Sequence, residues 1–429
     1  MRLPRDARSV MAWIGFPLAL VVLALLFPEA FGLRSDASLS PLAPVSMLKD
    51  PKLKRTLKAH SDRGADEPEP ELDPSLAEPG FGIRIRMSKA ALGTIEGVTT
   101  DDAPHRDDIH DIDIGLGEAP PQRASLRLHG QGTRKRPKKS FRIDLFQPRP
   151  FTAGVSLTRF FLVGMVDDPG LFRTPFCYHV LRELGLFPVF TQLVTVYVNE
   201  RPRGIHLLVE RPRDALKRTE PGLVSVARRR SRDRLFAKYA GPVRNALGLI
   251  DRLSRAPDLD EAAQLPEYEE ILDLEAYLTW LSFNSLVKYA DSLDEVFFYE
   301  VRPHGDAYGR LTLMAWDYDE VMKPPVHPEE AVDDELMYAC EARLDRFIQR
   351  NPVLYERFKR RLRSLLEETA TPVYLEDTLA RIKASLDAID SGLPAQEQAA
   401  ERATRSAQSE LFRSQLLERR AELLKLLER

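Results

Sequence analysis

The sequence of 429 residues has only two cysteines, Cys177 and Cys340, which excludes a disulfide-rich scaffold and a cysteine-rich zinc site. It also lacks a strong charge of either sign, because 62 Lys and Arg residues face 65 Asp and Glu residues. A nucleic-acid-binding domain is normally strongly basic, so we expect no nucleic-acid partner. The Gly-x-Ser-x-Gly, His-Glu-x-x-His and Walker-type lysine motifs are absent as well, which argues against the enzyme classes that carry them.

One long hydrophobic run is present, at the N-terminus. The residues from Val10 to Phe27 are almost all apolar, roughly the 18 needed to cross a bilayer, and arginines precede them at positions 2, 5 and 8. The positive-inside tendency then predicts that the rest of the chain is extracytoplasmic. Residues 1–34 are therefore interpreted as a signal anchor that holds the protein in the membrane. A signal peptide cleaved near Ala30-Phe31-Gly32, which would leave the protein secreted, and a buried globular helix are the alternatives.

The rest of the chain divides by composition. Residues 35–80 are rich in Pro and acids, as in Glu67-Pro68-Glu69-Pro70, and are expected to form a disordered linker. From Gly82 onward, short segments alternate apolar with polar residues, which is the period of half-buried strands. Helical periodicity dominates after about residue 334. The pattern predicts an α+β protein, with a strand-rich first half and mixed centre in residues 81–333 and a helical C-terminal region in residues 334–429.

The expected elements follow from these periods. We expect strands at Ile83–Met87, Ser125–His129, Phe141–Leu145, Phe160–Gly164, Leu193–Val198, Gly204–Val209, Val296–Val301 and Arg310–Trp316. We expect helices at Asp168–Leu184, Leu272–Lys288, Arg343–Glu368, Tyr374–Ile389 and Ala395–Leu427. Asp167 or Asp168 is expected to cap the first of these helices and Gly185 to end it. The acidic stretch Asp101–Asp113 is interpreted as a surface loop. The basic stretch Ala227–Lys238 is expected to lead into a helix with a solvated face, although its arginines can also bind phosphate or an acidic partner.

The first segment that can do chemistry is a glycine-rich turn. Gly130 and Gly132 are followed by Arg134 and then by Lys138 and Lys139 at the start of the next strand. Glycines let backbone N–H groups approach a ligand closely, and a lysine on the following strand can reach its phosphates. A plain turn with a basic rim is the alternative.

Two acidic segments complete the set. Asp291, Asp294 and Glu295 leave the C-terminal end of an apolar helix, where negative charge is unfavourable unless a cation is near. Asp317 and Asp319 close a strand and point to one side, so they can share a hard cation. Solvated surface loops are the alternative for both. A lysine and two separate acids are the parts that kinases use for phosphoryl transfer, with Mg²⁺ between acid and phosphates.

The order and spacing of four motifs resemble the spore-coat-protein-H-like (CotH) kinase family, over roughly residues 82–322. The motifs are His129-Gly130-Gln131-Gly132-Thr133-Arg134 with Pro137-Lys138-Lys139-Ser140-Phe141-Arg142, then Val196-Tyr197-Val198-Asn199 with Arg203-Gly204-Ile205-His206-Leu207-Leu208-Val209-Glu210, then Ala290-Asp291, then Trp316-Asp317-Tyr318-Asp319. The resemblance implies an atypical protein-kinase-like fold, ATP and Mg²⁺ as cofactors, and an exported protein or surface component as phosphoryl acceptor.

Roles carried over by the resemblance apply residue by residue. Lys138 matches the nucleotide lysine, with Lys139 as the adjacent alternative. Asp291 matches the catalytic aspartate. Asp317 matches the metal-binding aspartate and Asp319 is the second acid. Glu210 closes the strand motif and is expected to position the lysine.

One departure affects the metal site. Where the family often has an Asn as second metal ligand, this chain offers Asp294, Glu295 or Val296. Glu295 either replaces that ligand or marks a catalytically inactive pseudokinase that serves as an envelope-tethered binding module. Assembly through the apolar faces of the C-terminal helices is a third possibility.

Overall fold

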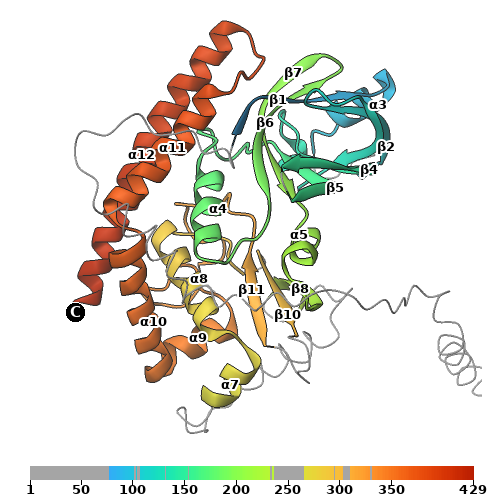
Figure 1. Ribbon diagram of the computed structural model, residues 1–429. Helices are drawn as coiled ribbons and strands as arrows, with labels where there is room; N and C mark the ends of the chain where they lie inside the picture. The colour runs from blue at the N-terminus through green and yellow to red at the C-terminus, as the bar shows by residue number, and fades with distance from the viewer. Residues whose placement is uncertain are drawn as a thin grey trace, which may run out of the picture. The chain divides into compact units, whose positions relative to one another are not determined.

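The computed structural model describes residues 77–100, 103, 107–130, 132–152, 154–231, 234–235, 265–293, 295–302, 310–328 and 331–429. Strands dominate its first half and helices its C-terminal part, as the sequence predicts (Figure 1). The N-terminal apolar run and nearly all of the linker, including residues 1–76, lie outside the described residues. Within the described part, no helix combines the length and apolarity required to span a membrane.

Seven strands close into a barrel in the order β1-β2-β3-β4-β5-β7-β6. Their bounds are β1 Ala77–Arg86, β2 His110–Leu116, β3 Gln122–Leu128, β4 Phe141–Thr152, β5 Val155–Val163, β6 Thr191–Val198 and β7 Arg201–Glu210. Neighbouring strands are antiparallel except β1 and β6, whose parallel pairing closes the barrel. Alternate side chains point inward, so residues such as Ile83, Leu126 and Ile143 form a core of their own.

Strand β2 corrects one expectation, because its residues fall in the stretch interpreted as an acidic loop. Ile112 and Ile114 are buried in the barrel core. The acids that precede each of them, Asp111 and Asp113, point outward, with carboxylates 3.8 Å and 3.9 Å from the guanidinium of Arg123. The alternation of apolar and acidic residues thus defines a strand with an acidic outer face.

Helix α4 (Arg173–Glu183) joins β5 to β6 and starts five residues later than the sequence predicts. The N-cap is Phe172, whose side chain makes no cap hydrogen bond, but Asp168 Oδ2 accepts the backbone N–H of Arg173, the first helical residue, at 2.7 Å from further upstream. Gly185, in the left-handed region at φ 74°, ends the helix as expected. Shorter elements of this half are α3 Lys89–Glu96, the 3-10 turn η3 Gly132–Lys135 and α5 Pro212–Thr219.

A second sheet has the strand order β11-β10-β8-β9. The bounds are β8 Leu223–Ser231, β9 Arg234–Leu235, β10 Val296–Val301 and β11 Leu311–Ala315. Strand β8 covers the start of the basic stretch, so the expected helix face is wrong for residues 227–231. The rest of the predicted helix, residues 236–253, lies outside the described residues.

The helical segments described after β9 are α7 Leu265–Ile271, α8 Leu274–Val287, α9 Arg343–Arg350, α10 Pro352–Ser364, η5 Leu365–Thr369, α11 Pro372–Ala388 and α12 Ala395–Leu427. The predicted helix at Arg343–Glu368 is interrupted at Asn351, whose side chain caps α10 by accepting the N–H of Leu354 at 3.0 Å. Pro352 begins the new helix, as proline favours. These helices, α4 and the second sheet share one large core, and α11 and α12 lie beside α4 in Figure 1.

Candidate active site

The ends of α8 and β11 lie side by side although they are far apart in the sequence. Tyr289, just after α8, pairs with Val321 in an antiparallel bridge. The backbone N–H of Ala290 donates to the carbonyl of Glu320 at 2.9 Å. The loop that contains Asp291 is therefore held against the loop that contains the acids after β11. The structure brings two of the three polar segments together.

The turn after β11 is held by hydrogen bonds to its backbone. Asp317 adopts the left-handed conformation at φ 55°, and its carbonyl accepts the N–H of Asp319 at 3.0 Å and the phenol of Tyr289 at 2.9 Å. Thr174 in the first turn of α4 donates its hydroxyl to the carbonyl of Tyr318 at 3.0 Å. A non-glycine residue at positive φ needs such support. The turn therefore has a defined conformation set by α4 and the end of α8.

This turn concentrates negative charge. The pKa of Asp319 is raised well above its ordinary value, first by burial and then by the negative charges of Asp317 and Glu320, with a smaller contribution from Asp167. Lys323 opposes the shift but does not cancel it. A carboxyl group with a strongly raised pKa beside a second acid is typical of a functional site that a cation completes.

Two arginines of β8 hold the loop that follows Asp291. Arg228 forms an ion pair with the carboxylate of Glu295. Arg229 is buried and donates to the carbonyls of Leu293 and, at 3.2 Å, of Ser292. In the sequence, these arginines are recognisable only as part of the basic stretch Ala227–Lys238. Their role was missed because nothing local indicates that β8 pairs with β10, directly after the acidic loop.

Lys138 and Lys139 have separate environments. Lys138 Nζ donates to the carbonyl of Ile205 on β7 at 2.5 Å, and burial lowers the pKa of Lys138 to about 8 although Glu401 and Asp168 oppose that shift. Lys139 points elsewhere and donates to the carbonyls of Val98 and Arg134 at 2.5 Å and 2.7 Å. Lys138 is therefore the lysine that lies near acids of the interior.

The glycine-rich turn adopts a compact conformation before these lysines. Gly130 has a φ of 92°, and a Cβ there would overlap the hydroxyl of Thr133. Gly132 begins the 3-10 turn η3, within which Arg134 forms an ion pair with Asp107. Arg134 is thus held on the turn, and Gly130 is a position that only glycine fits.

The loop before α4 connects the lysine side to the acidic side. Asp167 forms an ion pair at 3.3 Å with Arg136, which lies just before the two lysines. The negative charge of Asp167 also helps to raise the pKa of Asp319. The negative charge of its neighbour Asp168 favours the ammonium form of Lys138, and burial raises the pKa of Asp168 itself to about 6. The lysine segment and the turn after β11 therefore both lie near this loop, and the Asp291 loop adjoins that turn.

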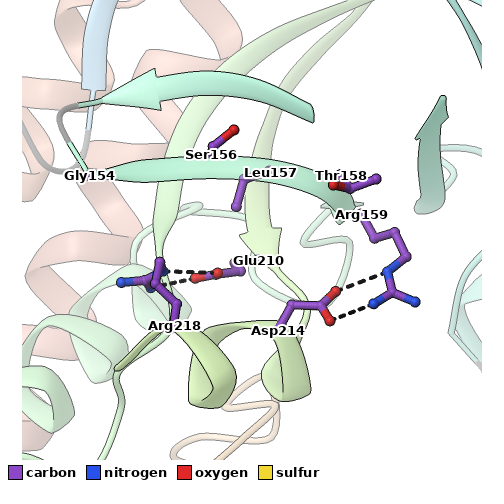
Figure 2. A pocket seen from close by; sticks show the side chains of 8 residues that line it. All are labelled: Gly154, Ser156, Leu157, Thr158, Arg159, Glu210, Asp214 and Arg218. Atoms are coloured by element: carbon purple, nitrogen blue, oxygen red, sulfur yellow. Dashed lines mark hydrogen bonds and ion pairs between the residues drawn. The ribbon is translucent and has the colours of Figure 1, made fainter. Parts of the chain in front are cut away.

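Glu210 lies apart from that cluster. Both of its oxygens bind Arg218, at 2.6 Å and 3.1 Å, and one also accepts the N–H of Phe190 at 3.0 Å. Along β7 it is five residues beyond the Lys138 contact at Ile205, which is about 16 Å of strand. Figure 2 shows it lining a cavity of about 360 Å³ between β5 and α5, where Asp214 binds Arg159 in the same bidentate manner.

Asp317 and Asp319 are the acids of this region that can hold a hard cation, because carboxylate oxygens are suitable ligands and the two residues adjoin on one turn. Among the residues that the structure describes, no three His, Cys, Asp or Glu side chains are placed to hold a metal ion. Mg²⁺ usually takes only one or two carboxylates together with substrate phosphates and water. Asp317 and Asp319 are such a pair, whereas Glu295 is engaged by Arg228.

A basic barrel residue and two acidic loops are the residue types that phosphotransferases use. Comparison with protein families agrees. The chain matches the family model described as CotH kinase protein over residues 126–234 and 237–421. The match covers more than half of the sequence, and the protein belongs to the CotH kinase family. It begins within β3 and continues into α12, so the C-terminal helices are part of the family region. A comparison with curated proteins found no match.

Proposed function

We propose that the protein is an atypical kinase that transfers the γ-phosphoryl group of ATP to a hydroxyl group of an exported protein or cell-surface component. The observation that carries the proposal is that Lys138 and the Asp317–Asp319 turn both lie near the loop before α4, with the Asp291 loop adjoining that turn. Membership of the CotH kinase family supports a phosphotransferase. The nature of the acceptor rests on the N-terminal apolar run, which favours an extracytoplasmic protein bound to the membrane or secreted.

Each group has a role that its environment supports. Lys138 binds the phosphates of the nucleotide, since its ammonium lies beside the carbonyl of Ile205 and is predominantly charged at neutral pH with a pKa of about 8. Asp317 and Asp319 hold Mg²⁺, which neutralises charge on the phosphates when bound. Asp291 orients the acceptor hydroxyl and takes its proton. Phosphoryl transfer needs positioning and charge neutralisation rather than a covalent nucleophile, and these residues supply both.

A catalytically inactive pseudokinase, acting as an envelope-tethered binding module, is the second candidate. The ion pair between Glu295 and Arg228 favours it, because an acid held by an arginine is less available as the second metal ligand. In that case the site keeps its fold and loses phosphoryl transfer.

The test is calorimetric measurement of Mg²⁺-dependent ATP binding to the full chain. We expect Asp317→Asn to lower the affinity for Mg²⁺-ATP at least tenfold, because one of two metal carboxylates is lost. The exposed Asp333, changed to Asn, is the matched control and should bind like the natural protein. Absence of binding in the folded natural chain would contradict the kinase. Binding without phosphorylation of any exported protein would favour the pseudokinase.

A further inference from the structure

The first half of α12 contacts β7 at the point where Lys138 is bound. A Cβ built on Gly204 would lie 3.6 Å from Oε1 of Glu401, on α12. The carbonyl of the next residue, Ile205, accepts the hydrogen bond from Lys138 Nζ at 2.5 Å. The carboxylate of the C-terminal helix and the ammonium of the barrel therefore lie beside consecutive residues of one strand and act on each other through their charges rather than as a direct ion pair.

Glu401 is held in place by a series of alternating charges. Arg405, one turn further along α12 and 3% exposed, lies 3.8 Å from Glu401. Its Nε is 3.5 Å from Oδ1 of Asp387 on α11. The other carboxylate oxygen of Asp387, Oδ2, accepts a hydrogen bond from Lys383 at 2.7 Å. Nε and Nη1 of Arg405 have no hydrogen-bond partner among the described residues. A buried ion pair of this kind adds little stability compared with apolar residues, so stability alone does not explain it.

The titratable and charged groups around Lys138 come from two elements and one loop. Glu401 and Arg405 face it from α12, Asp168 from the loop before α4, and His206 from β7. His206 is neutral, because burial, followed by the charge of Lys138, lowers its pKa to about 3. Of the two acids, Asp168 already accepts backbone hydrogen bonds at the start of α4. Glu401 caps no helix. Its negative charge is the largest effect that favours the protonated form of Lys138.

We propose that Glu401 is the positioning residue for Lys138, so that the C-terminal helix completes the phosphate-binding side of the site. The proposal deepens the kinase function proposed above and rests on it where the ligand of the lysine is concerned. Protein kinases likewise orient their nucleotide lysine with a glutamate from a helix packed on the strand layer. The resemblance to the family led us to expect Glu210 in this role, but Glu210 binds Arg218 instead. The acid near the lysine is Glu401, 191 residues after Glu210 in the sequence.

The first experiment measures the lysine itself and needs no nucleotide. The amines of the full chain are trace-labelled with an acylating reagent from pH 6 to 10, and the labelling of Lys138 is followed by mass spectrometry. We expect the titration midpoint, near 8 in the natural protein, to fall by about one pH unit in Glu401→Gln, because removing a nearby negative charge disfavours the ammonium. Glu397→Gln, an exposed acid one turn earlier, is the matched control and should leave the midpoint unchanged. An unchanged midpoint in Glu401→Gln overturns the proposal.

The second experiment measures Mg²⁺-ATP affinity at pH 7. We expect affinity to fall about tenfold in Glu401→Gln and to recover in part in Glu401→Asp, which keeps the charge. A residue with a structural role alone would lower the unfolding midpoint and leave the lysine titration as it is. If Glu401→Gln does not fold, the titration in Glu401→Asp decides, since a shortened carboxylate must also shift it. If the natural chain binds no ATP, the kinase proposal fails, whereas the labelling result still decides the role of Glu401.

Discussion

The barrel and the region that follows it build their cores in different ways. The barrel core consists of residues from Ile83 to Leu208, mostly on antiparallel neighbours, and each strand fills it with every second side chain. The other core combines residues from Phe161 to Leu423, contributed by α4, the second sheet and all the long C-terminal helices. The barrel is thus formed mostly by strands consecutive in the sequence, with β1 and β6 closing it, whereas the second region depends on distant segments throughout. The cation of the site comes from the first and its acids from the second.

The largest effect is expected from a substitution in the second core, at a contact between residues about 240 positions apart in the sequence. Phe412 of α12 is fully buried, with ring centroids 5.7 Å and 5.4 Å from those of Phe172 and Phe176. We expect Phe412→Ala to lower the free energy of unfolding by about 3–5 kcal/mol, from lost burial and the cavity left behind. Denaturant unfolding followed by tryptophan fluorescence measures it, since Trp280 and Trp316 both belong to this core. Leu411→Ala, at an exposed neighbour, should change the free energy by less than about 0.5 kcal/mol. Equal losses in both variants would contradict the dependence on distant segments.

The next prediction separates the two adjacent lysines at the edge of the barrel. We expect Lys138→Met to lower Mg²⁺-ATP affinity about 100-fold, because the ammonium that binds the phosphates is replaced by an apolar chain, and to lower stability by only about 1 kcal/mol, because relief of its desolvation offsets the lost hydrogen bond to Ile205. Lys139→Met should leave the affinity unchanged and lower stability by about 1–3 kcal/mol, because the carbonyls of Val98 and Arg134 both lose their donor. Calorimetry and thermal unfolding of both variants provide the comparison. Loss of nucleotide affinity in Lys139→Met alone would assign the phosphates to the other lysine.

The smallest effect concerns pH, at the loop between the two regions. The pKa of Asp168 is raised by burial to about 6, against an ordinary value of 3.8, so folding favours the protonated carboxyl. Its contribution to stability is therefore present below pH 4 and is lost as the pH rises through 6. Asp168→Asn keeps an oxygen that accepts the N–H of Arg173 and removes the charge. We expect the variant to be about 2 kcal/mol more stable than the natural protein at pH 7 and equal to it at pH 4. Denaturant unfolding at both values tests this, and equal stability at pH 7 would contradict it.

What the sequence reveals depends on whether the signal is local. The strands of Phe141–Leu145 and Leu193–Val198 and the stop at Gly185 were predictable because alternation and a glycine act within a few residues. The acids at the ends of α8 and β11 were also recognisable, since polar residues end apolar elements there. Family membership, anticipated from four motifs, was confirmed.

Long-range pairing explains what the sequence did not reveal. Arg229 looked like a surface residue until the pairing of β8 with β10 placed it under the carbonyls of Ser292 and Leu293. Glu401 carries no local sign of function, because it is one of several acids on a polar helix. The helix break at Asn351 could have been anticipated, as an Asn-Pro pair is a cap followed by a favoured first residue.

Helix α12 follows the other described elements of its core in the sequence, which has a consequence for biosynthesis. Its Phe412 contacts Phe172 and Phe176, and its Arg419 donates to the carbonyls of Ser285 and Glu335 at 3.1 Å and 2.9 Å. A chain emerges from the ribosome N-terminus first and its early parts fold before its last. A nascent polypeptide therefore has a barrel and both acidic loops before it has the helix that completes the second core. That core is closed only once translation has passed Leu423, which is buried in it.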